Sequence, residues 1–343
     1  MTIIDLRSDT VTLPTPAMRE AMYRAEVGDA GYGEDPTINR LEELAATITG
    51  KEAAMFVPSG TMGNCLSVLA HTCRGDEVIL ESESHIYFNE VAGMAALGSV
   101  QARTVPGRRG VLDPGQVEAA VRPQNVHFPR TSLLCVENTH NRGGGTVTPL
   151  ATLAELYRVA HRNGMCVHMD GARVFNAATY LGVPVAEVVR HTDSVMFCLS
   201  KGLAAPVGSM VAGPAGWMAE ARRYRKMLGG GMRQAGILAA AGLVALTTMT
   251  GRLHQDHELA KKLAVDLSRL PGIQVDLDAV QTNIIFVDVA AARKDAKSVC
   301  AALAEQGVRC NPAAATRIRL VTHKDIAAED IDVAVEAFAK ALS

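Results

Sequence analysis

Near its middle the chain contains an apolar run that stops abruptly at an aspartate, Met165-Cys166-Val167-His168-Met169-Asp170-Gly171-Ala172-Arg173. Similar apolar runs lie at residues 131–136, 194–199 and 207–212. Strands that are apolar at every position are typical of a sheet buried on both faces. Residues 150–163, which lie between the runs 131–136 and 165–169, have the periodicity of a helix. We therefore predict an α/β fold with a mostly parallel central sheet and helices on both faces.

The same alternation extends toward the N-terminus. Residues 53–57 form a short apolar run that ends in Pro58-Ser59-Gly60-Thr61, and a helical pattern follows to about residue 73. Residues 77–80 are apolar again. Ligands of such sheets bind at the carboxyl ends of the strands, so the chemistry is expected there.

The pattern changes after Gly229-Gly230-Gly231. Residues 234–270 are nearly all helix-forming, Pro271-Gly272 ends that stretch, and the remainder alternates strand and helix. The strands are expected at 284–289 and 317–321, and the helices at 297–306 and 327–341. We predict an N-terminal segment (1–15), a large cofactor-binding domain (16–250) and a smaller C-terminal α+β domain (251–343).

Composition excludes several classes of partner. The 343 residues carry a formal net charge of −2, so no basic excess points to nucleic acid. No apolar run approaches the length of a membrane span, and charges come too early for a signal peptide. The seven cysteines are an odd number without tight spacing, which fits a reducing compartment. A cytoplasmic enzyme is therefore expected.

A lysine follows the apolar run 194–199 directly, in Ser200-Lys201-Gly202. At the end of a buried strand, desolvation lowers the pKa of an ammonium group and favours the neutral amine. A neutral amine attacks aldehydes, so Lys201 is suited to form a Schiff base. A solvated turn lysine is the alternative.

Asp170 ends another strand, and Arg173 follows it. A carboxylate at this place could hold a metal, act as a base or keep a pyridine nitrogen protonated. The planar guanidinium of Arg173 suits a substrate carboxylate. The alternative for this pair is an Asp–Arg ion pair that caps a helix.

Small residues open the helix after the run 53–57. Gly60 and Thr61 would offer free backbone N–H groups at a helix N-terminus, which binds anions such as phosphate. A simple helix cap is the alternative. Taken together, a phosphate cradle, a ring-nitrogen carboxylate and a strand-end lysine are the fixed contacts that pyridoxal phosphate requires. No dinucleotide or Walker-type motif is present.

These residues lie in blocks that resemble the low-specificity L-threonine aldolase family along essentially the whole chain. The blocks are Arg7-Ser8-Asp9-Thr10-Val11-Thr12, Tyr32-Gly33-Glu34-Asp35-Pro36, Glu137-Asn138-Thr139-His140-Asn141, His168 to Arg173, Ser200-Lys201-Gly202, Gly229-Gly230-Gly231-Met232-Arg233-Gln234 and Arg319-Leu320-Val321-Thr322-His323. The resemblance implies an aspartate-aminotransferase-like fold, which is fold type I of the pyridoxal-phosphate enzymes. It also implies retro-aldol cleavage of L-threonine, L-allo-threonine and other β-hydroxy-α-amino acids to glycine and an aldehyde such as acetaldehyde.

The resemblance also implies roles for individual residues. Pyridoxal 5'-phosphate would be covalently bound to Lys201, with Asp170 at the ring nitrogen and His85 stacked on the ring. Gly60 and Thr61 would hold the phosphate, helped by Ser200 and Arg233. The substrate carboxylate would be bound by Ser8, Arg173 and Arg319.

Two further expectations concern residues supplied by neighbouring subunits and the identity of the catalytic base. His127 would lie near the substrate hydroxyl, and Tyr32 would reach the site of a neighbouring subunit. The family is usually a homotetramer, a dimer of dimers with shared active sites. Either His85 or His127 could be the base that removes the hydroxyl proton. Where the family often has an aromatic residue, this chain has Asn89, which could alter the aldehyde pocket.

Three alternatives remain at this stage. The same cofactor supports β-elimination, racemisation and transamination. A non-catalytic binding module on the same scaffold would have lost Lys201 or Asp170, and both are present. A metal-dependent aldolase could use His168 and Asp170, which share one face of a strand, but no third ligand is evident at a suitable spacing, so no metal is expected.

Overall fold

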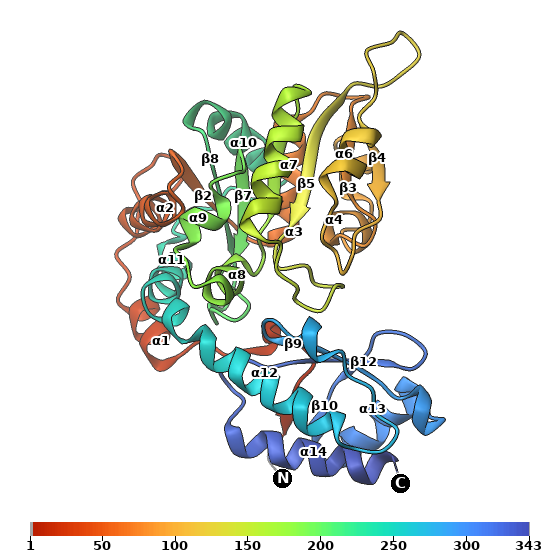
Figure 1. Ribbon diagram of the computed structural model, residues 1–343. Helices are drawn as coiled ribbons and strands as arrows, with labels where there is room; N and C mark the ends of the chain where they lie inside the picture. The colour runs from red at the N-terminus through yellow and green to blue at the C-terminus, as the bar shows by residue number, and fades with distance from the viewer. Residues whose placement is uncertain (1–2, 343) are drawn as a thin grey trace.

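The computed structural model describes residues 3–342, and a seven-stranded sheet forms its centre (Figure 1). The strand order is β2-β8-β7-β6-β5-β3-β4, with the bounds β2 (Ala53–Val57), β3 (Glu77–Glu81), β4 (Gln101–Val105), β5 (Thr131–Glu137), β6 (Cys166–Asp170), β7 (Ser194–Cys198) and β8 (Ser209–Gly213). Strands β4, β3, β5, β6 and β7 are mutually parallel, whereas β8 is antiparallel to both β7 and β2. The mostly parallel sheet is thus confirmed. Strand β8 runs against it because residues 199–208 form turns, and a parallel return needs a longer crossover.

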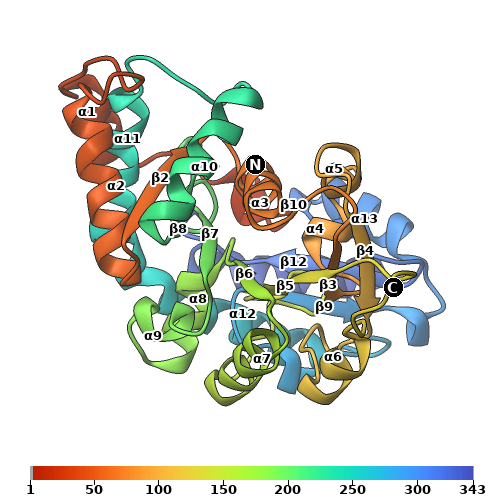
Figure 2. The same cartoon turned by 90° about the horizontal axis from the view of Figure 1, so that it is seen from above.

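Helices cover both faces of this sheet, as predicted (Figure 2). On one face lie α3 (Gly60–His71), α4 (His85–Phe88), α5 (Gly93–Ala96) and α10 (Ala215–Met227); on the other lie α6 (Pro114–Ala120), α7 (Leu150–Arg162), α8 (Val174–Leu181) and α9 (Val185–Val189). Successive strand residues point to opposite faces. On β6, Val167 and Met169 join the core with α7, whereas His168 and Asp170 contact α3. This alternation turns the polar residues of β6 toward the helix that begins with Gly60.

The N-terminal helices pack against the chain after the large sheet. Helices α1 (Pro16–Tyr23) and α2 (Pro36–Thr49) contact α11 (Gly236–Val244). A π-helical turn, η2 (Ala245–Met249), and a 3-10 turn, η3 (Thr250–Arg252), connect α11 to α12 (Leu253–Ser268). The nearly continuous helix predicted for residues 234–270 is therefore confirmed.

The C-terminal part has its own sheet and its own core. Strand β12 (Arg317–Val321) pairs antiparallel with β9 (Ile284–Asp288) and β11 (Asn311–Pro312), and α12, α13 (Ala296–Glu305) and α14 (Ala328–Leu342) pack beside them. The N-terminal strand β1 (Ile4–Asp5) pairs with β10 (Val308–Arg309), which brings Ile4 and Leu6 into this core. Short 3-10 turns complete the chain: η1 (Asp9–Val11), η4 (Leu277–Ala279) and η5 (Ala290–Ala292).

The two separate apolar cores support the predicted α+β character of the C-terminal part. The domain bounds 1–15, 16–250 and 251–343 stay a prediction, and residues 1, 2 and 343 lie outside the described part of the chain.

The expectation that no segment reaches membrane-spanning length was wrong. By length and composition, the 33-residue helical stretch Gly236–Ser268 would suffice, with a mean hydropathy of 1.4 in its most apolar window. Half of that window is buried inside the protein, because α11 packs on α1 and α2 while α12 packs on α8 and α14. Its apolar character is therefore accounted for by packing between the two cores, as in many core helices of globular proteins.

Candidate active site

A cavity of about 380 Å³ opens at the carboxyl ends of β6 and β7, next to the start of α3. Its lining includes these predicted site residues: Gly60, Thr61, His85, Asp170, Ser200 and Lys201. They come from four separate stretches of the sequence. Position at a strand end or a helix start, the signal used for Gly60, Asp170 and Lys201, is what brings them together.

Asp170 is the last residue of β6 and is 2% exposed. Its Oδ1 accepts a hydrogen bond from the backbone N–H of Ala172 (3.1 Å), and its Oδ2 accepts one from Asn64 Nδ2 (2.9 Å). A Cβ at Gly171 would lie 2.9 Å from the carbonyl oxygen of Met196, so glycine lets the chain leave the sheet here. Two donors thus hold a buried carboxylate in a fixed orientation.

Lys201 enters the same cavity from the turn after β7. Its backbone carbonyl accepts a hydrogen bond from Thr12 Oγ1 (3.0 Å), which fixes the turn. Among residues 3–342, Nζ has no hydrogen-bond or ion-pair partner, and Lys201 is half-buried in the cavity lining, whereas the solvated turn lysine that was the alternative would be exposed. The amine is therefore available to a ligand in the cavity that Asp170 also lines.

The start of α3 has the form of an anion site. Ser59 caps the helix by accepting a hydrogen bond from Met62 N at its Oγ (3.2 Å), and its carbonyl accepts one from Gly63 N (3.1 Å). Within the described chain, the N–H groups of Gly60 and Thr61 have no acceptor. A Cβ at Gly60 would lie 3.1 Å from Cys198 Sγ. A phosphate group fits this cradle, because it accepts hydrogen bonds and is attracted by the helix dipole.

His85 begins α4 at the mouth of the cavity. Its backbone N–H donates to Glu137 Oε2 (2.6 Å), and its Nδ1 lies 2.9 Å from Glu90 Oε1. Burial favours the neutral ring, but the hydrogen bond to Glu90 and the charge of Asp170 outweigh it and raise the pKa of His85. Nε2 makes no hydrogen bond within residues 3–342, so it is the ring nitrogen left for a substrate.

Sequence analysis missed Asn64 and Glu90, which line this cavity too. Asn64 is fully buried one helical turn after Gly60, and a polar residue on the sheet-facing side of an apolar helix is the signal that could have found it. Glu90 follows His85 by five residues, and burial together with the charge of Asp170 raises its pKa. Asn64 Nδ2 donates to Glu90 Oε1 (2.8 Å) as well as to Asp170.

His85, Glu90 and Asp170 are residue types that bind metals, with one ligand atom from each within 4.8 Å of the others. The hydrogen bonds through Asn64 and between Glu90 and His85 already join them. His168, the other ligand considered for a metal, uses Nε2 toward Asn64 Oδ1 (3.2 Å) and Nδ1 toward Ser194 Oγ (2.8 Å). With both ring nitrogens in these contacts, His168 offers no free ligand atom.

The predicted carboxylate-binding residues gather beside the cavity, at the junction with the small core. Arg173 donates from Nε and Nη2 to Asp9 (2.7 and 2.6 Å), and both residues are buried. The Asp–Arg ion pair that was the alternative for Arg173 therefore exists, but its acid is Asp9 from the N-terminal segment. Ser8, next in the chain, caps η1.

Arg319 on β12 donates from Nη2 to Asn141 Oδ1 (2.9 Å) and from Nη1 to the carbonyl of Arg7 (3.3 Å). Its Nε is buried without a partner within the described residues. Burial and the nearby charge of Arg173 lower the pKa of Arg319 to about 10. A carboxylate would relieve both the unpaired donor and the repulsion between the two arginines.

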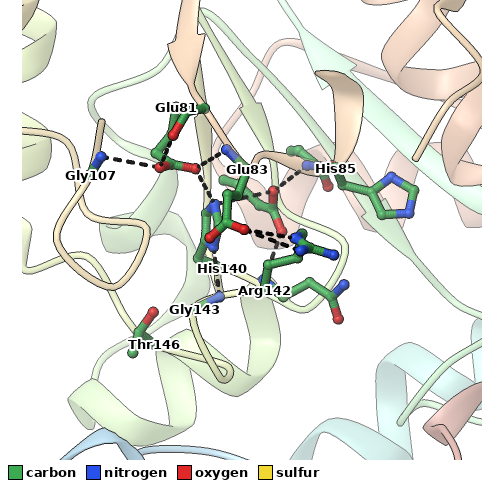
Figure 3. A network of polar contacts seen from close by, with 12 residues as sticks. Glu81, Glu83, His85, Gly107, His140, Arg142, Gly143 and Thr146 are labelled. Atoms are coloured by element: carbon green, nitrogen blue, oxygen red, sulfur yellow. Dashed lines mark hydrogen bonds and ion pairs between the residues drawn. The ribbon is translucent and has the colours of Figure 1, made fainter. Parts of the chain in front are cut away.

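A buried polar network holds the loop after β5 (Figure 3). The Glu137 carboxylate accepts hydrogen bonds from the backbone N–H of His85 at Oε2 and from the backbone N–H of Asn141 at Oε1 (2.7 Å). One carboxylate therefore fixes both His85 and Asn141, the residue that Arg319 contacts. His140 Nδ1 accepts from Gly143 N (3.0 Å), which leaves the ring proton on Nε2, 3.0 Å from Glu81 Oε2. Burial opposes the charge on Glu81, but the close contact with His140 and the backbone hydrogen bond from Glu83 outweigh it and lower the pKa of Glu81 to about 2.

Besides Ser8, Arg173 and Arg319, three more predicted residues do not line the cavity of this chain: His127, Tyr32 and Arg233. His127 lies in the loop before β5, which projects from the end of the sheet opposite to the cavity (Figure 1). Tyr32 is 80% exposed, and the Arg233 side chain is 64% exposed and contacts Asp29 at 3.4 Å. Their roles stay predictions that require a second subunit. Asn89 lines a neighbouring cavity of about 440 Å³ together with Arg319.

The chain is similar to known proteins along almost its whole length. Residues 5–291 match the family model described as beta-eliminating lyase. Low-specificity L-threonine aldolase 1 of Arabidopsis thaliana is 46% identical over 347 aligned residues, which cover 100% of this chain and 97% of the relative.

Solved structures agree on the fold. A threonine aldolase of Leishmania major superposes with a TM-score of 0.84 at 18% identity, covering 99% of this chain and 100% of that one. A structure of serine palmitoyltransferase (SPT) with pyridoxal phosphate (PLP) superposes with a TM-score of 0.77 at 18% identity, covering 99% and 87%. The fold is therefore that of pyridoxal-phosphate-dependent enzymes, as predicted.

Proposed function

Because this chain belongs to the beta-eliminating lyase family, and within it to the low-specificity L-threonine aldolases, we propose that it cleaves L-threonine and L-allo-threonine to glycine and acetaldehyde with pyridoxal 5'-phosphate. One observation carries the cofactor assignment. Within residues 3–342, a lysine without a hydrogen-bond partner and a buried carboxylate share a cavity with helix N-terminal N–H groups that have no acceptor. The amine, the carboxylate and the N–H groups match, in that order, an aldehyde, a protonated ring nitrogen and a phosphate on one small molecule.

We assign the residues to the parts of the cofactor accordingly. Lys201 would hold it covalently through Nζ, Gly60 and Thr61 would bind the phosphate with help from Ser200, and Asp170 would accept a hydrogen bond from the ring nitrogen. The bound cofactor supplies an electron sink for the bond between Cα and Cβ of the substrate. Asp170 serves that chemistry by keeping the ring nitrogen protonated.

The remaining groups act on the substrate. Arg319, with Arg173 and Ser8 beside it, binds the carboxylate and so fixes which substrate bond stands perpendicular to the ring. Nε2 of His85 takes the proton from the β-hydroxyl, since Nδ1 is held by Glu90. His127 is the second candidate for this base, and it would have to come from a neighbouring subunit.

We further propose a cytoplasmic homotetramer with shared active sites. Support comes from Tyr32, Arg233 and His127, which lie outside the cavity of their own chain and on its surface. Mixing two inactive variants tests sharing. Lys201→Ala and Tyr32→Ala subunits are unfolded and reassembled together. A shared site that takes Lys201 from the Tyr32→Ala subunit and Tyr32 from the Lys201→Ala subunit should regain activity. No regain, with native mass spectrometry showing mixed tetramers, would remove the shared site.

A product assay tests the reaction itself. Wild-type protein loaded with the cofactor should convert L-threonine to equal amounts of glycine and acetaldehyde. Lys201→Ala should lose this turnover, and Lys226→Ala, an exposed lysine outside the cavity, should keep it. The name of the matching family model makes β-elimination the second candidate, and ammonia with 2-oxobutyrate in place of glycine would establish it.

A further inference from the structure

A buried row of polar side chains runs behind the cofactor cavity, on the α3 side of the sheet. Asn64 Oδ1 lies 3.2 Å from His168 Nε2, and His168 Nδ1 lies 2.8 Å from Ser194 Oγ. Ser194 Oγ in turn lies 2.7 Å from His71 Nε2. Asn64, His168 and Ser194 are 0% exposed. No role proposed above uses this row.

The direction of each hydrogen bond follows from the two carboxylates at its end. Glu90 and Asp170 both face Asn64, and carboxylates accept, so the Asn64 amide must present its NH₂ group to them. Its carbonyl oxygen then accepts from His168 Nε2–H. His168 Nδ1 consequently accepts from the Ser194 hydroxyl, which accepts from His71 Nε2–H.

The directions require a neutral His168, because its Nδ1 accepts a hydrogen bond, and burial favours the neutral form of both histidines. Burial lowers the pKa of His168 to about 3 and the pKa of His71 to about 4. Every donor in the row therefore points toward the carboxylates. The aligned bonds reinforce one another in a low-dielectric interior and place the positive end of the row at Asp170 and Glu90.

The two carboxylates need such a donor because like charges in one buried site favour uptake of a proton. Asp170 must stay ionised to hold a ring N–H. Glu90 faces His85 from its own segment, Asp170 from β6, Asn64 and Cys65 from α3 and Cys135 from β5, while Lys201 also acts on His85. Asn64 Nδ2 donates to Glu90 Oε1 at 2.8 Å, and His85 is the titratable group of this set that lies within hydrogen-bond distance of Glu90, at 2.9 Å, so it can share the proton of Glu90.

We propose that Asn64 is a positioning residue whose amide, oriented by His168, keeps Asp170 ionised and directs the shared proton to Glu90 and His85. This inference rests on the proposed function, since it specifies how the same site is kept in its working protonation state. It also ties the stacking histidine to the ring-nitrogen carboxylate through one side chain.

A purely structural role for Asn64 makes a different prediction. Ser67 on the same helix is also fully buried and donates to the carbonyl of Gly63 (2.7 Å), yet it contacts neither carboxylate. Ser67→Ala is therefore the matched control for losing a buried polar group from α3. Asn64→Leu removes the donors and the acceptor but keeps the number and branching of the side-chain heavy atoms. Asn64→Ser retains one hydroxyl donor for one carboxylate.

The experiment measures binding of pyridoxal phosphate to apoprotein, and the pH midpoint of the visible absorbance of the bound cofactor. For Asn64→Leu we expect about 10- to 100-fold weaker binding, the usual effect of a lost hydrogen bond to a charged group. We also expect a shift of about one pH unit or more in the absorbance midpoint. Asn64→Ser should fall between Asn64→Leu and wild type, and Ser67→Ala should match wild type in both readouts.

Wild-type cofactor affinity with an unshifted midpoint in Asn64→Leu would overturn the proposal. If Asn64→Leu does not fold, wild-type values in Asn64→Ser would overturn it in the same way. Equal changes of cofactor affinity and absorbance midpoint in Ser67→Ala would show that Asn64 acts only through packing. A failure of the proposed function is distinguishable, because wild-type protein would then bind the cofactor but release no glycine from L-threonine.

Discussion

The buried pair of Asp9 and Arg173 gives the sharpest prediction about stability. Asp9→Asn keeps the shape of the side chain but removes the charge that receives two guanidinium hydrogen bonds, at 2.7 and 2.6 Å. Arg173 and Arg319 would then be buried close together without their acid. Breaking a buried ion pair from one side costs about 3–5 kcal/mol, so the free energy of unfolding of the apoprotein should fall by that amount near pH 7.

The pH dependence follows from the pKa of Asp9. Burial opposes its charge, but Arg173 outweighs burial and holds the pKa well below the usual 3.8. The stability that Asp9 contributes is therefore fully present above pH 3.8 and is lost as the pH falls below it. The difference between wild type and Asp9→Asn should be constant from pH 7 to about pH 5 and shrink in stronger acid.

Urea denaturation of both apoproteins at equal subunit concentration is the assay. The control is Asp5→Asn, because Asp5 pairs with the 41%-exposed side chain of Arg7 and such pairs contribute about 1 kcal/mol or less. A loss below about 1 kcal/mol in Asp9→Asn, or one equal to that in Asp5→Asn, would refute the account of this pair.

Other predictions concern the site. Because Glu90 raises the pKa of His85 and the base must be neutral, kcat should fall as the pH drops through a value above 6.5, and His85→Asn should lose that acidic limb; an unchanged pH profile in this variant would exclude His85 as the base. If neither His85→Ala nor His127→Ala lowers kcat, both base candidates fall. Treatment with a chelator should leave the rate unchanged, since hydrogen bonds join His85, Glu90 and Asp170, and a rate restored only by added metal would reverse this assignment. Glu137→Gln should raise KM more than it lowers kcat, because Glu137 orients the Asn141 that holds Arg319; an unaltered KM would contradict that role.

Local sequence signals predicted most of the fold. The strands around Asp170 and Lys201 are continuous apolar runs, and that pattern directly reflects burial on both faces of the sheet. The antiparallel course of β8 was not predicted, because it depends on the length of the connection and not on the composition of the strand. The helix over Gly236–Ser268 was predicted, but its apolar character was underestimated because polar residues interrupt the stretch.

The site was predictable where one residue's position in its element sets its role. Gly60, Asp170 and Lys201 follow from helix starts and strand ends. Asn64 and Glu90 were missed, because their roles come from neighbours distant in the sequence.

The partner of Arg173 is likewise 164 positions away in the chain, a pairing that no local pattern encodes. The roles proposed for Tyr32, Arg233 and His127 would depend on contacts between subunits, which single-chain patterns do not contain.

The central claim is that Lys201 carries the cofactor opposite Asp170. Borohydride reduction of the yellow holoenzyme, followed by digestion and peptide mass spectrometry, locates the attached cofactor directly. We expect the added mass on the peptide that contains Lys201 and on no other lysine. Added mass on a different lysine, or none on a fully active enzyme, would contradict the account.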